Sequence, residues 1–163
     1  ESEMGKGTEF FFKLPLKLEE EPAGKRVLTM TSSGLTLPDW AEREVLVVED
    51  EISNFMVVES MLKKTNIEVN WAKDGEEAIV MFKKKLQKID IILMDIKMPK
   101  MDGFEAAKQI RKVDKDMPVI ALTAYALPKE EHLIRQGSFN DYMAKPITRD
   151  KLIRVMSQYM KRT

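Results

Sequence analysis

Cysteine is absent from the 163 residues of the sequence. This absence excludes disulfide bonds, metal sites with thiolate ligands and cysteine nucleophiles, and it favours a reducing compartment. No apolar run approaches the roughly 18 residues of a membrane-spanning helix, and the charged N-terminus does not resemble a secretory signal peptide. We therefore expect a cytoplasmic piece of a longer protein, without membrane contact of its own, although the parent could be a membrane-bound sensor.

An excess of charge of one sign is also absent. The 27 basic and 27 acidic side chains cancel, so no overall field attracts nucleic acid, and we expect no direct nucleic-acid contact. Histidine occurs once, at His132, in a polar stretch where we expect a solvated surface residue. The composition, 44% hydrophobic and 33% charged, is that of an ordinary globular domain.

Residues 1–18 differ in character from the rest of the chain. A Gly-Lys-Gly turn at positions 5–7 precedes a run in which apolar residues alternate with others. Period-2 alternation after a glycine turn predicts a hairpin that ends in a half-buried strand. The residues on the shared apolar face are Phe10, Phe12, Leu14 and Leu16.

Residues 19–43 contain proline, glycine and serine breakers and show no clear period. This composition predicts a linker. Within it, residues 26–30 could form one short strand.

From Glu44 to the C-terminus, apolar strand-like runs alternate with helical patterns, which predicts a parallel sheet with helices on both faces. The predicted strands are residues 45–48, 67–71, 91–94, 119–122 and 141–143. The predicted helices lie near residues 53–64, 75–86, 103–112, 128–136 (ending at Gly137) and from a cap at Thr148 to about residue 160. Five such units predict an α/β fold, a doubly wound parallel sheet with helices on both faces.

Polar residues stand where four of the predicted strands end. The carboxyl ends of parallel strands meet at one edge of the sheet, where such folds bind ligands. These residues should therefore share one crevice. They are Glu49 and Asp50, Asp95, Thr123, and Lys145 followed by Pro146.

Three acids, a hydroxyl and an amine suit a divalent cation beside a carboxylate nucleophile. Mg²⁺ takes one or two carboxylates together with water and phosphate oxygens. We expect Asp50 and Asp95 to be direct ligands and Glu49 to hold a coordinated water. Asp95 can attack a phosphoryl group, because phosphoryl transfer depends mainly on positioning and charge neutralisation. Lys145 and Thr123 can then contact the phosphoryl oxygens.

Simpler explanations exist for each residue alone, since acids at strand ends are often helix caps and Lys-Pro is often a surface turn. A flavin- or nucleotide-binding module of the same fold would need a phosphate-cradling loop after the first strand, but acids stand there. An aspartyl-phosphate phosphatase would usually carry a second acid two residues beyond the nucleophile, where Lys97 stands. A third alternative is a degenerate domain that serves only for docking.

With these motifs in place, residues 44–163 resemble a response-regulator receiver domain of two-component signalling. The resemblance implies a doubly wound sheet of strand order 2-1-3-4-5, the flavodoxin-like arrangement. The matching segments are residues 45–50, 91–99, 101–103, 119–124 and 142–146. The resemblance implies that Asp95 is the phosphoacceptor, beside the acidic pair Glu49 and Asp50. It also implies that Lys97 offers its backbone carbonyl to Mg²⁺, that Thr123 and Lys145 complete the site, and that Tyr125 is an aromatic switch coupled to Thr123.

The same resemblance implies a function and partners. A receiver takes its phosphoryl group from a histidine kinase or a histidine-phosphotransfer domain, remodels the surface of its fourth helix, fifth strand and fifth helix, and loses the group to water. His132 is not the phosphodonor histidine of such a relay.

Residues 5–16 resemble the last hairpin of a histidine-kinase ATP-binding domain. None of the ATP-binding boxes of that domain is present, so the chain is not expected to bind ATP or to act as a kinase by itself. The order of kinase remnant, linker and receiver resembles the C-terminal end of a hybrid sensor kinase. The exposed apolar face of the remnant predicts pairing with a sheet edge or a homodimer through this strand.

Overall fold

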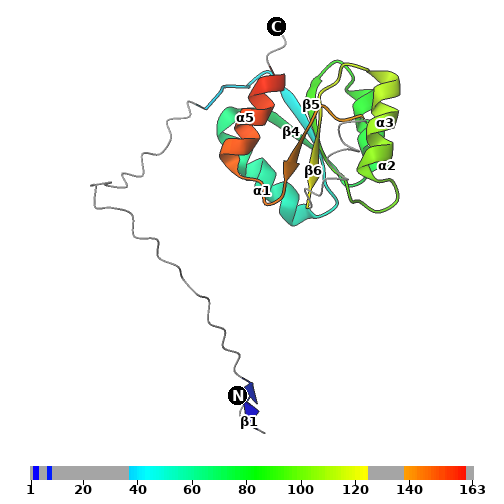
Figure 1. Ribbon diagram of the computed structural model, residues 1–163. Coiled ribbons are helices and arrows are strands. Elements are labelled where there is room, and N and C mark those ends of the chain that lie inside the picture. The colour runs from blue at the N-terminus through cyan, green and yellow to red at the C-terminus, as the bar shows by residue number, and fades with distance from the viewer. Residues whose placement is uncertain (1, 4–6, 9–36, 125–137, 161–163) are drawn as a thin grey trace, which may run out of the picture. The chain divides into compact units, whose positions relative to one another are not determined.

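The computed structural model describes residues 2–3, 7–8, 37–124 and 138–160, and these fall in two units, Glu1–Gly34 and Leu35–Thr163 (Figure 1). In the first unit, strand β1 (Ser2–Glu3) pairs antiparallel with β2 (Gly7–Thr8). This short pair stands where the glycine turn predicts a hairpin. The alternating run at 10–16 and the strand considered at 26–30 lie outside the described residues.

The second unit is built on five parallel strands. Their order in the sheet is β4-β3-β5-β6-β7, which confirms the predicted 2-1-3-4-5 arrangement. The predicted strand positions are confirmed to within two residues. The strands are β3 (Glu44–Val48), β4 (Glu68–Ala72), β5 (Ile89–Asp95), β6 (Val119–Thr123) and β7 (Asp141–Ala144).

Helices cover both faces of this sheet in the described part of the chain. The helices α1 (Ile52–Leu62) and α5 (Arg149–Tyr159) lie on one face, and α2 (Gly75–Lys84) and α3 (Gly103–Val113) lie on the other (Figure 1). A short 3₁₀ turn, η1 (Lys63–Thr65), extends α1. The predicted helix at 128–136 lies outside the described residues. None of the helices described has the length and apolar character that a bilayer crossing demands.

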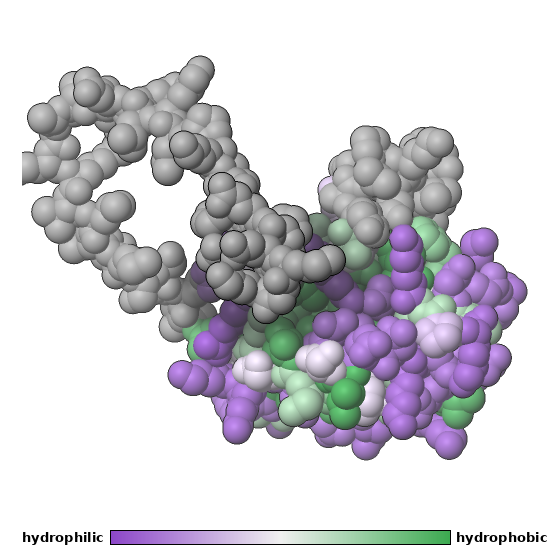
Figure 2. Space-filling view, turned by 90° about the horizontal axis from the view of Figure 1, so that it is seen from below, coloured by the Kyte–Doolittle hydropathy of each residue, from purple (hydrophilic) through white to green (hydrophobic). Residues whose placement is uncertain are grey.

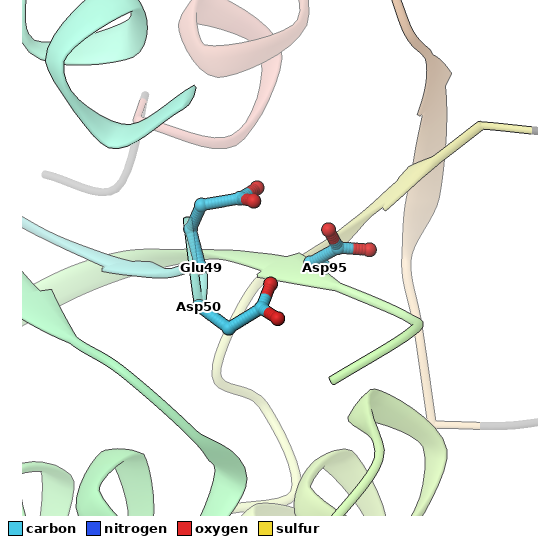
Figure 3. Close-up of side chains that lie close together, drawn as sticks. All are labelled: Glu49, Asp50 and Asp95. Atoms are coloured by element: carbon cyan, nitrogen blue, oxygen red, sulfur yellow. The ribbon is translucent and has the colours of Figure 1, made fainter. Parts of the chain in front are cut away.

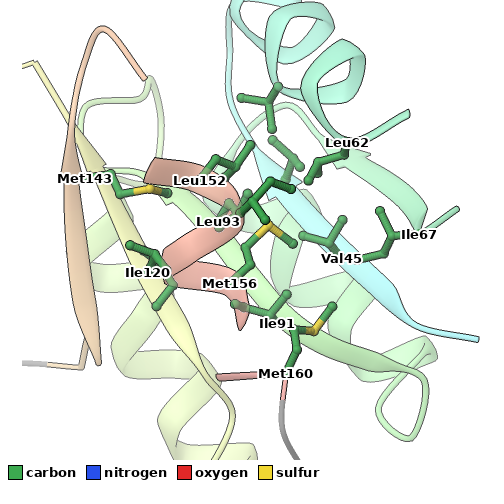
Figure 4. Close-up of a cluster of buried hydrophobic side chains, with 14 of the residues drawn as sticks. Val45, Leu62, Ile67, Ile91, Leu93, Ile120, Met143, Leu152, Met156 and Met160 are labelled. Atoms are coloured by element: carbon green, nitrogen blue, oxygen red, sulfur yellow. The ribbon is translucent and has the colours of Figure 1, made fainter. Parts of the chain in front are cut away.

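Two hydrophobic clusters hold the layers together, one on each face of the sheet. Every residue of β3 and β6 is buried, as expected for strands packed on both sides. Figure 4 shows the cluster under α1 and α5, where side chains of the central strands meet those of the two helices. Its labelled members include Val45, Leu62, Ile91, Leu93, Ile120, Leu152 and Met156.

Two aspartates begin the helices of the opposite face. Asp74 accepts a hydrogen bond from the Glu77 amide and Asp102 accepts one from the Glu105 amide, each at 2.9 Å. These N-caps confirm the helix starts that the Asp-Gly pairs predict. Thr148 also occupies an N-cap position, before α5, but its side chain makes no capping hydrogen bond.

Residues 37–43, which the sequence analysis placed in the linker, belong to the second unit. Trp40 is buried in the cluster under α1 and α5, and Leu37 packs against the same cluster. The Trp40 amide donates to the Thr65 carbonyl at 2.6 Å, and the Glu68 amide donates to the Arg43 carbonyl at 2.9 Å. The sequence shows no period here because one anchoring side chain, not a repeated pattern, fixes the segment.

Candidate functional site

The three acids predicted to share a crevice lie together at the carboxyl edge of the sheet. Glu49 and Asp50 follow the last residue of β3, and Asp95 is the last residue of the neighbouring β5. One carboxylate oxygen of each lies within 4.8 Å of the others. Figure 3 shows the three side chains leaving adjacent strand ends toward a common space. Parallel pairing in register therefore assembles the cluster from residues far apart in the sequence.

Lys145 reaches the same cluster from the end of β7. Its Nζ donates to Asp95 Oδ2 at 2.5 Å and to Glu49 Oε2 at 2.7 Å. The following peptide bond to Pro146 is cis. The predicted contact between Lys145 and Asp95 is thus present, and Glu49 is a second partner that the sequence reasoning did not assign to this lysine.

The site gathers several charged side chains. Three carboxylates lie together, and the Lys145 ammonium contacts two of them, those of Asp95 and Glu49. Burial lowers the pKa of Lys145, but its hydrogen bonds to Asp95 and Glu49 outweigh that effect and leave the pKa above its ordinary value. Burial raises the pKa of the Glu49 carboxyl, against the hydrogen bonds from Lys145 and Asn54. A protonated Lys145 and a crowded acidic cluster favour one additional small cation.

Glu49 is held by a residue that the sequence reasoning did not single out for this role. Asn54, in the first turn of α1, donates from its side-chain amide to Glu49 Oε1 at 2.8 Å. The backbone amide of Glu49 donates to the Ala72 carbonyl at 3.0 Å. The Glu49 side chain is therefore fixed by Asn54 and Lys145 together. In the sequence, Asn54 lies one helical turn beyond the acids.

Asp95 is oriented by the turn that follows it. Its Oδ1 accepts a hydrogen bond from the Lys97 backbone amide at 3.0 Å. The Gly103 amide, at the start of α3, donates to the Ile96 carbonyl at 2.9 Å. Lys97 was predicted to contribute its carbonyl to a metal. The structure places its amide at Asp95 and leaves the metal role of the carbonyl a prediction.

Thr123 and Lys145 meet across the last two strands. Thr123 ends β6, is buried, and pairs in register with Ala144 of β7. Its carbonyl accepts from the Lys145 amide at 2.7 Å. Thr123 therefore ends its strand beside the segment that carries Lys145. Tyr125, predicted as the switch residue, lies outside the described residues.

The donor set fits Mg²⁺. Carboxylate oxygens are the ligands this ion prefers, and one or two of them usually suffice. Asp50 is exposed, so it can take part in a hydrated site that is open to solvent. The view in Figure 2, from below Figure 1, looks onto this edge, where hydrophilic residues predominate with smaller hydrophobic areas between them. A pocket of about 230 Å³ adjoins Glu49 and Lys145 and is lined further by Asn54, Val57 and Ile147.

The sequence model of the response regulator receiver domain matches residues 45–157. The chain belongs to the response regulator receiver family. Hybrid signal transduction histidine kinase M of Dictyostelium discoideum is 35% identical over 119 residues, which are 70% of this chain and 5% of that protein. Sensor protein EvgS of Escherichia coli is 30% identical over 158 residues, 97% of this chain and 13% of that protein. This receiver chain thus spans a small part of each of these two relatives.

Solved structures show the same receiver fold. The receiver domain of sensor histidine kinase PA1611 from Pseudomonas aeruginosa, with a magnesium ion coordinated in its active-site cleft, has a TM-score of 0.67 and 36% identity, covering 74% of this chain and 98% of that one. A second match is the co-crystal of the Saccharomyces cerevisiae histidine phosphotransfer protein Ypd1 with the receiver domain of Ssk1. Its TM-score is 0.67 at 30% identity, and the match covers 76% of this chain and 90% of the matched chain.

Proposed function

We propose that this receiver accepts a phosphoryl group on Asp95 from a phosphohistidine and later releases it to water. The observation that carries the proposal is the contact of the Asp95 carboxylate with Lys145 inside a cluster of two further acids. An aspartate that served only as a helix cap would not be buried beside a lysine and two other carboxylates. The same contacts make a docking-only domain the less favoured alternative, because three carboxylates and Lys145 already lie close together.

The transfer step requires little movement of these residues. A carboxylate oxygen of Asp95 attacks phosphorus, the phosphorus–nitrogen bond of the donor imidazole breaks, and the nitrogen keeps the bonding electrons and takes a proton from solvent. Lys145 moves its hydrogen bonds from Asp95 to a phosphoryl oxygen. Glu49, Asp50 and Asp95 would hold Mg²⁺, with the Lys97 carbonyl as a further ligand, and the ion when bound neutralises phosphoryl charge. Water later attacks phosphorus, the bond from phosphorus to the Asp95 oxygen breaks, and inorganic phosphate leaves with the Asp95 carboxylate restored.

The phosphorylated state also changes the surface. A phosphoryl group adds roughly −1.5 to −2 charge and three acceptor oxygens. The Thr123 hydroxyl is drawn to one of these oxygens, and Tyr125 fills the space that Thr123 leaves. We propose that the surface of the fourth helix, fifth strand and fifth helix then changes its affinity for partners.

The donor is proposed to be a histidine kinase or a histidine-phosphotransfer domain. Ile52, Met56 and Val57 on α1 expose half or more of their surface. Val57 also lines the pocket that leads to Glu49 and Lys145. An exposed apolar patch beside a reactive site is typical of a transient protein contact. The complex of Ypd1 with the Ssk1 receiver supports a partner of this class.

We propose that this chain is a cytoplasmic part of a hybrid sensor kinase, with a kinase remnant at 1–18, a linker at 19–43 and the receiver at 44–163. The similarity to Sensor protein EvgS extends over 158 residues, well beyond the 45–157 of the receiver match, and so includes most of the N-terminal segment. The relative from Dictyostelium discoideum is itself a hybrid histidine kinase by name. This chain carries no ATP-binding boxes, so it is proposed to act as the acceptor and not as the kinase.

Incubation with acetyl phosphate tests the proposal. In the presence of Mg²⁺ we expect the intact mass of the protein to rise by one phosphoryl group and to return on standing, because the acyl phosphate hydrolyses. Addition of EDTA before acetyl phosphate should abolish the rise, since the acidic cluster then keeps its uncompensated charge. Ca²⁺ at the same ionic strength serves as the control for general screening. No mass gain with any donor in Mg²⁺ would support the docking-only alternative.

We further propose that the N-terminal strand mediates weak homodimerisation. Residues 10–16 alternate apolar and other side chains, and such an edge pairs readily with a second copy. Light scattering should give a higher average mass for the whole chain than for a chain starting at Leu35, the first residue of the second unit. Equal masses at high protein concentration would contradict a role for this strand.

A further inference from the structure

Trp71 makes a hydrogen bond that ordinary strand pairing does not supply. Strands β3 and β4 pair in register up to Val48 and Ala72, and the Glu49 amide donates to the Ala72 carbonyl. Continuation of this parallel ladder would bring the Asp74 amide to the Glu49 carbonyl. The chain turns away at that point, because Asp74 is the N-cap of α2. The indole Nε1–H of Trp71 donates to the Glu49 carbonyl instead, at 2.8 Å.

The indole is held in place by its neighbours. The ring of Phe55, on α1, stacks on it with centroids 4.8 Å apart and an angle of 11° between the planes. The Lys73 ammonium lies 5.4 Å from the ring centroid, within reach of a cation–π contact. Trp71 itself packs against the cluster under α1 and α5. The ring therefore has little freedom to rotate away from Glu49.

The bonded carbonyl belongs to the peptide unit that joins the two acids. The amide of that unit is the amide of Asp50, so the plane of the unit sets the direction in which Asp50 leaves the strand. Asp50 is exposed and lies within 4.8 Å of two other carboxylates, which repel it. Without a fixed peptide plane, this repulsion would turn Asp50 away from the site when no cation is present.

We propose that Trp71 is a positioning residue that holds the Glu49–Asp50 peptide in the orientation needed for divalent-cation binding. The proposal rests on the proposed function, since it assumes that the acidic cluster takes Mg²⁺. Trp71 touches neither the cation nor the phosphoryl group. It acts through the backbone between the two acids, whereas Asn54 and Lys145 act on the Glu49 side chain.

The first test is Trp71→Phe, which keeps an aromatic ring and removes the N–H donor. We expect the dissociation constant for Mg²⁺, measured by isothermal titration calorimetry, to rise about 3- to 10-fold, the effect of one lost neutral hydrogen bond. The rate of phosphorylation at saturating Mg²⁺ should stay near that of the unsubstituted protein. A merely structural role would lower the melting temperature without this split between metal affinity and saturated rate.

A second variant separates the N–H group from packing. In a Trp40→Phe background, replacement of Trp71 by β-(3-benzothienyl)alanine keeps the ring shape and deletes only the donor. Trp40 is buried near Thr65, away from the acids, so Trp40→Phe alone is the matched control and should bind Mg²⁺ normally. The analogue protein should show the same 3- to 10-fold weakening. In the metal-free protein, the NMR order parameter of the Asp50 amide should fall from the value of about 0.85 typical of a rigid backbone.

An analogue protein that binds Mg²⁺ as tightly as the Trp40→Phe control, with an unchanged Asp50 order parameter, would overturn the role of Trp71. Failure of the unsubstituted protein to bind Mg²⁺ would instead contradict the proposed function. In that case the Asp50 order parameter in the metal-free protein alone decides whether the indole holds the peptide.

Discussion

Asp95→Asn is expected to take up no phosphoryl group from acetyl phosphate, whatever the Mg²⁺ concentration. The amide has almost the shape of the carboxylate, but it is a much weaker nucleophile and carries no charge for the cation. Its side-chain oxygen can still accept the Lys97 amide hydrogen bond, so the turn after β5 should persist. Removal of one of three crowded carboxylates also relieves repulsion, and the thermal stability of the metal-free protein should therefore not decrease.

Intact-mass measurement and circular dichroism check this expectation together. Asp102→Asn is the matched control, because it makes the same chemical change seven residues further along the chain, and Asn is as good an N-cap as Asp. The control should accept a phosphoryl group normally. A mass gain for Asp95→Asn equal to that of the control would remove Asp95 from its proposed role.

Gly103→Ala should destabilise the receiver by about 3 kcal/mol, the upper range for an overpacked core. A Cβ atom at residue 103 would fall far inside contact distance of the Asp95 carbonyl oxygen and 3.0 Å from Ile96 Cα. Both of these atoms belong to the backbone and cannot rotate away. Either α3 or the end of β5 must therefore shift. At an ordinary helix position Gly→Ala stabilises a protein by about 0.5–1 kcal/mol. A steric clash at residue 103 and helix propensity therefore predict opposite signs for the change in unfolding free energy.

Urea unfolding measures the stability change, and phosphorylation by acetyl phosphate measures its effect at the site. We expect slower phosphorylation, because the shifted backbone is that of Asp95 itself. Lys108→Ala, on the exposed side of the same helix, is the control for helix propensity and should alter neither quantity by much. A stabilised Gly103→Ala protein would show that the close approach to Asp95 is not present in solution.

The sequence was sufficient to predict the sheet and the assembly of the acids. The apolar runs before Glu49, Asp95 and Thr123 are continuous because their strands are buried on both faces, so their ends were easy to locate. Strand order then followed from the resemblance of the motifs to receiver domains. Once the order was known, residues at the carboxyl ends had to lie close together, which placed Lys145 near Asp95.

Contacts made by single side chains between distant segments could not be predicted in the same way. Trp71 carries no sequence motif, and its bond to Glu49 depends on where β4 stops pairing. Trp40 was placed in a linker because its neighbours contain breakers and show no period. The contacts of Trp71 and Trp40 join segments far apart in the sequence and follow no local repeat. The contact of Asn54 with Glu49 is local, but it depends on how α1 begins after the acids.

The burial of Trp40 has a practical consequence for anyone who grafts this domain onto another protein. A splice placed at Glu44, where the first strand of the sheet begins, would discard the indole and remove a buried member of the cluster under α1 and α5. The fusion point should therefore lie upstream of Leu37, so that the transferred domain keeps both Leu37 and Trp40.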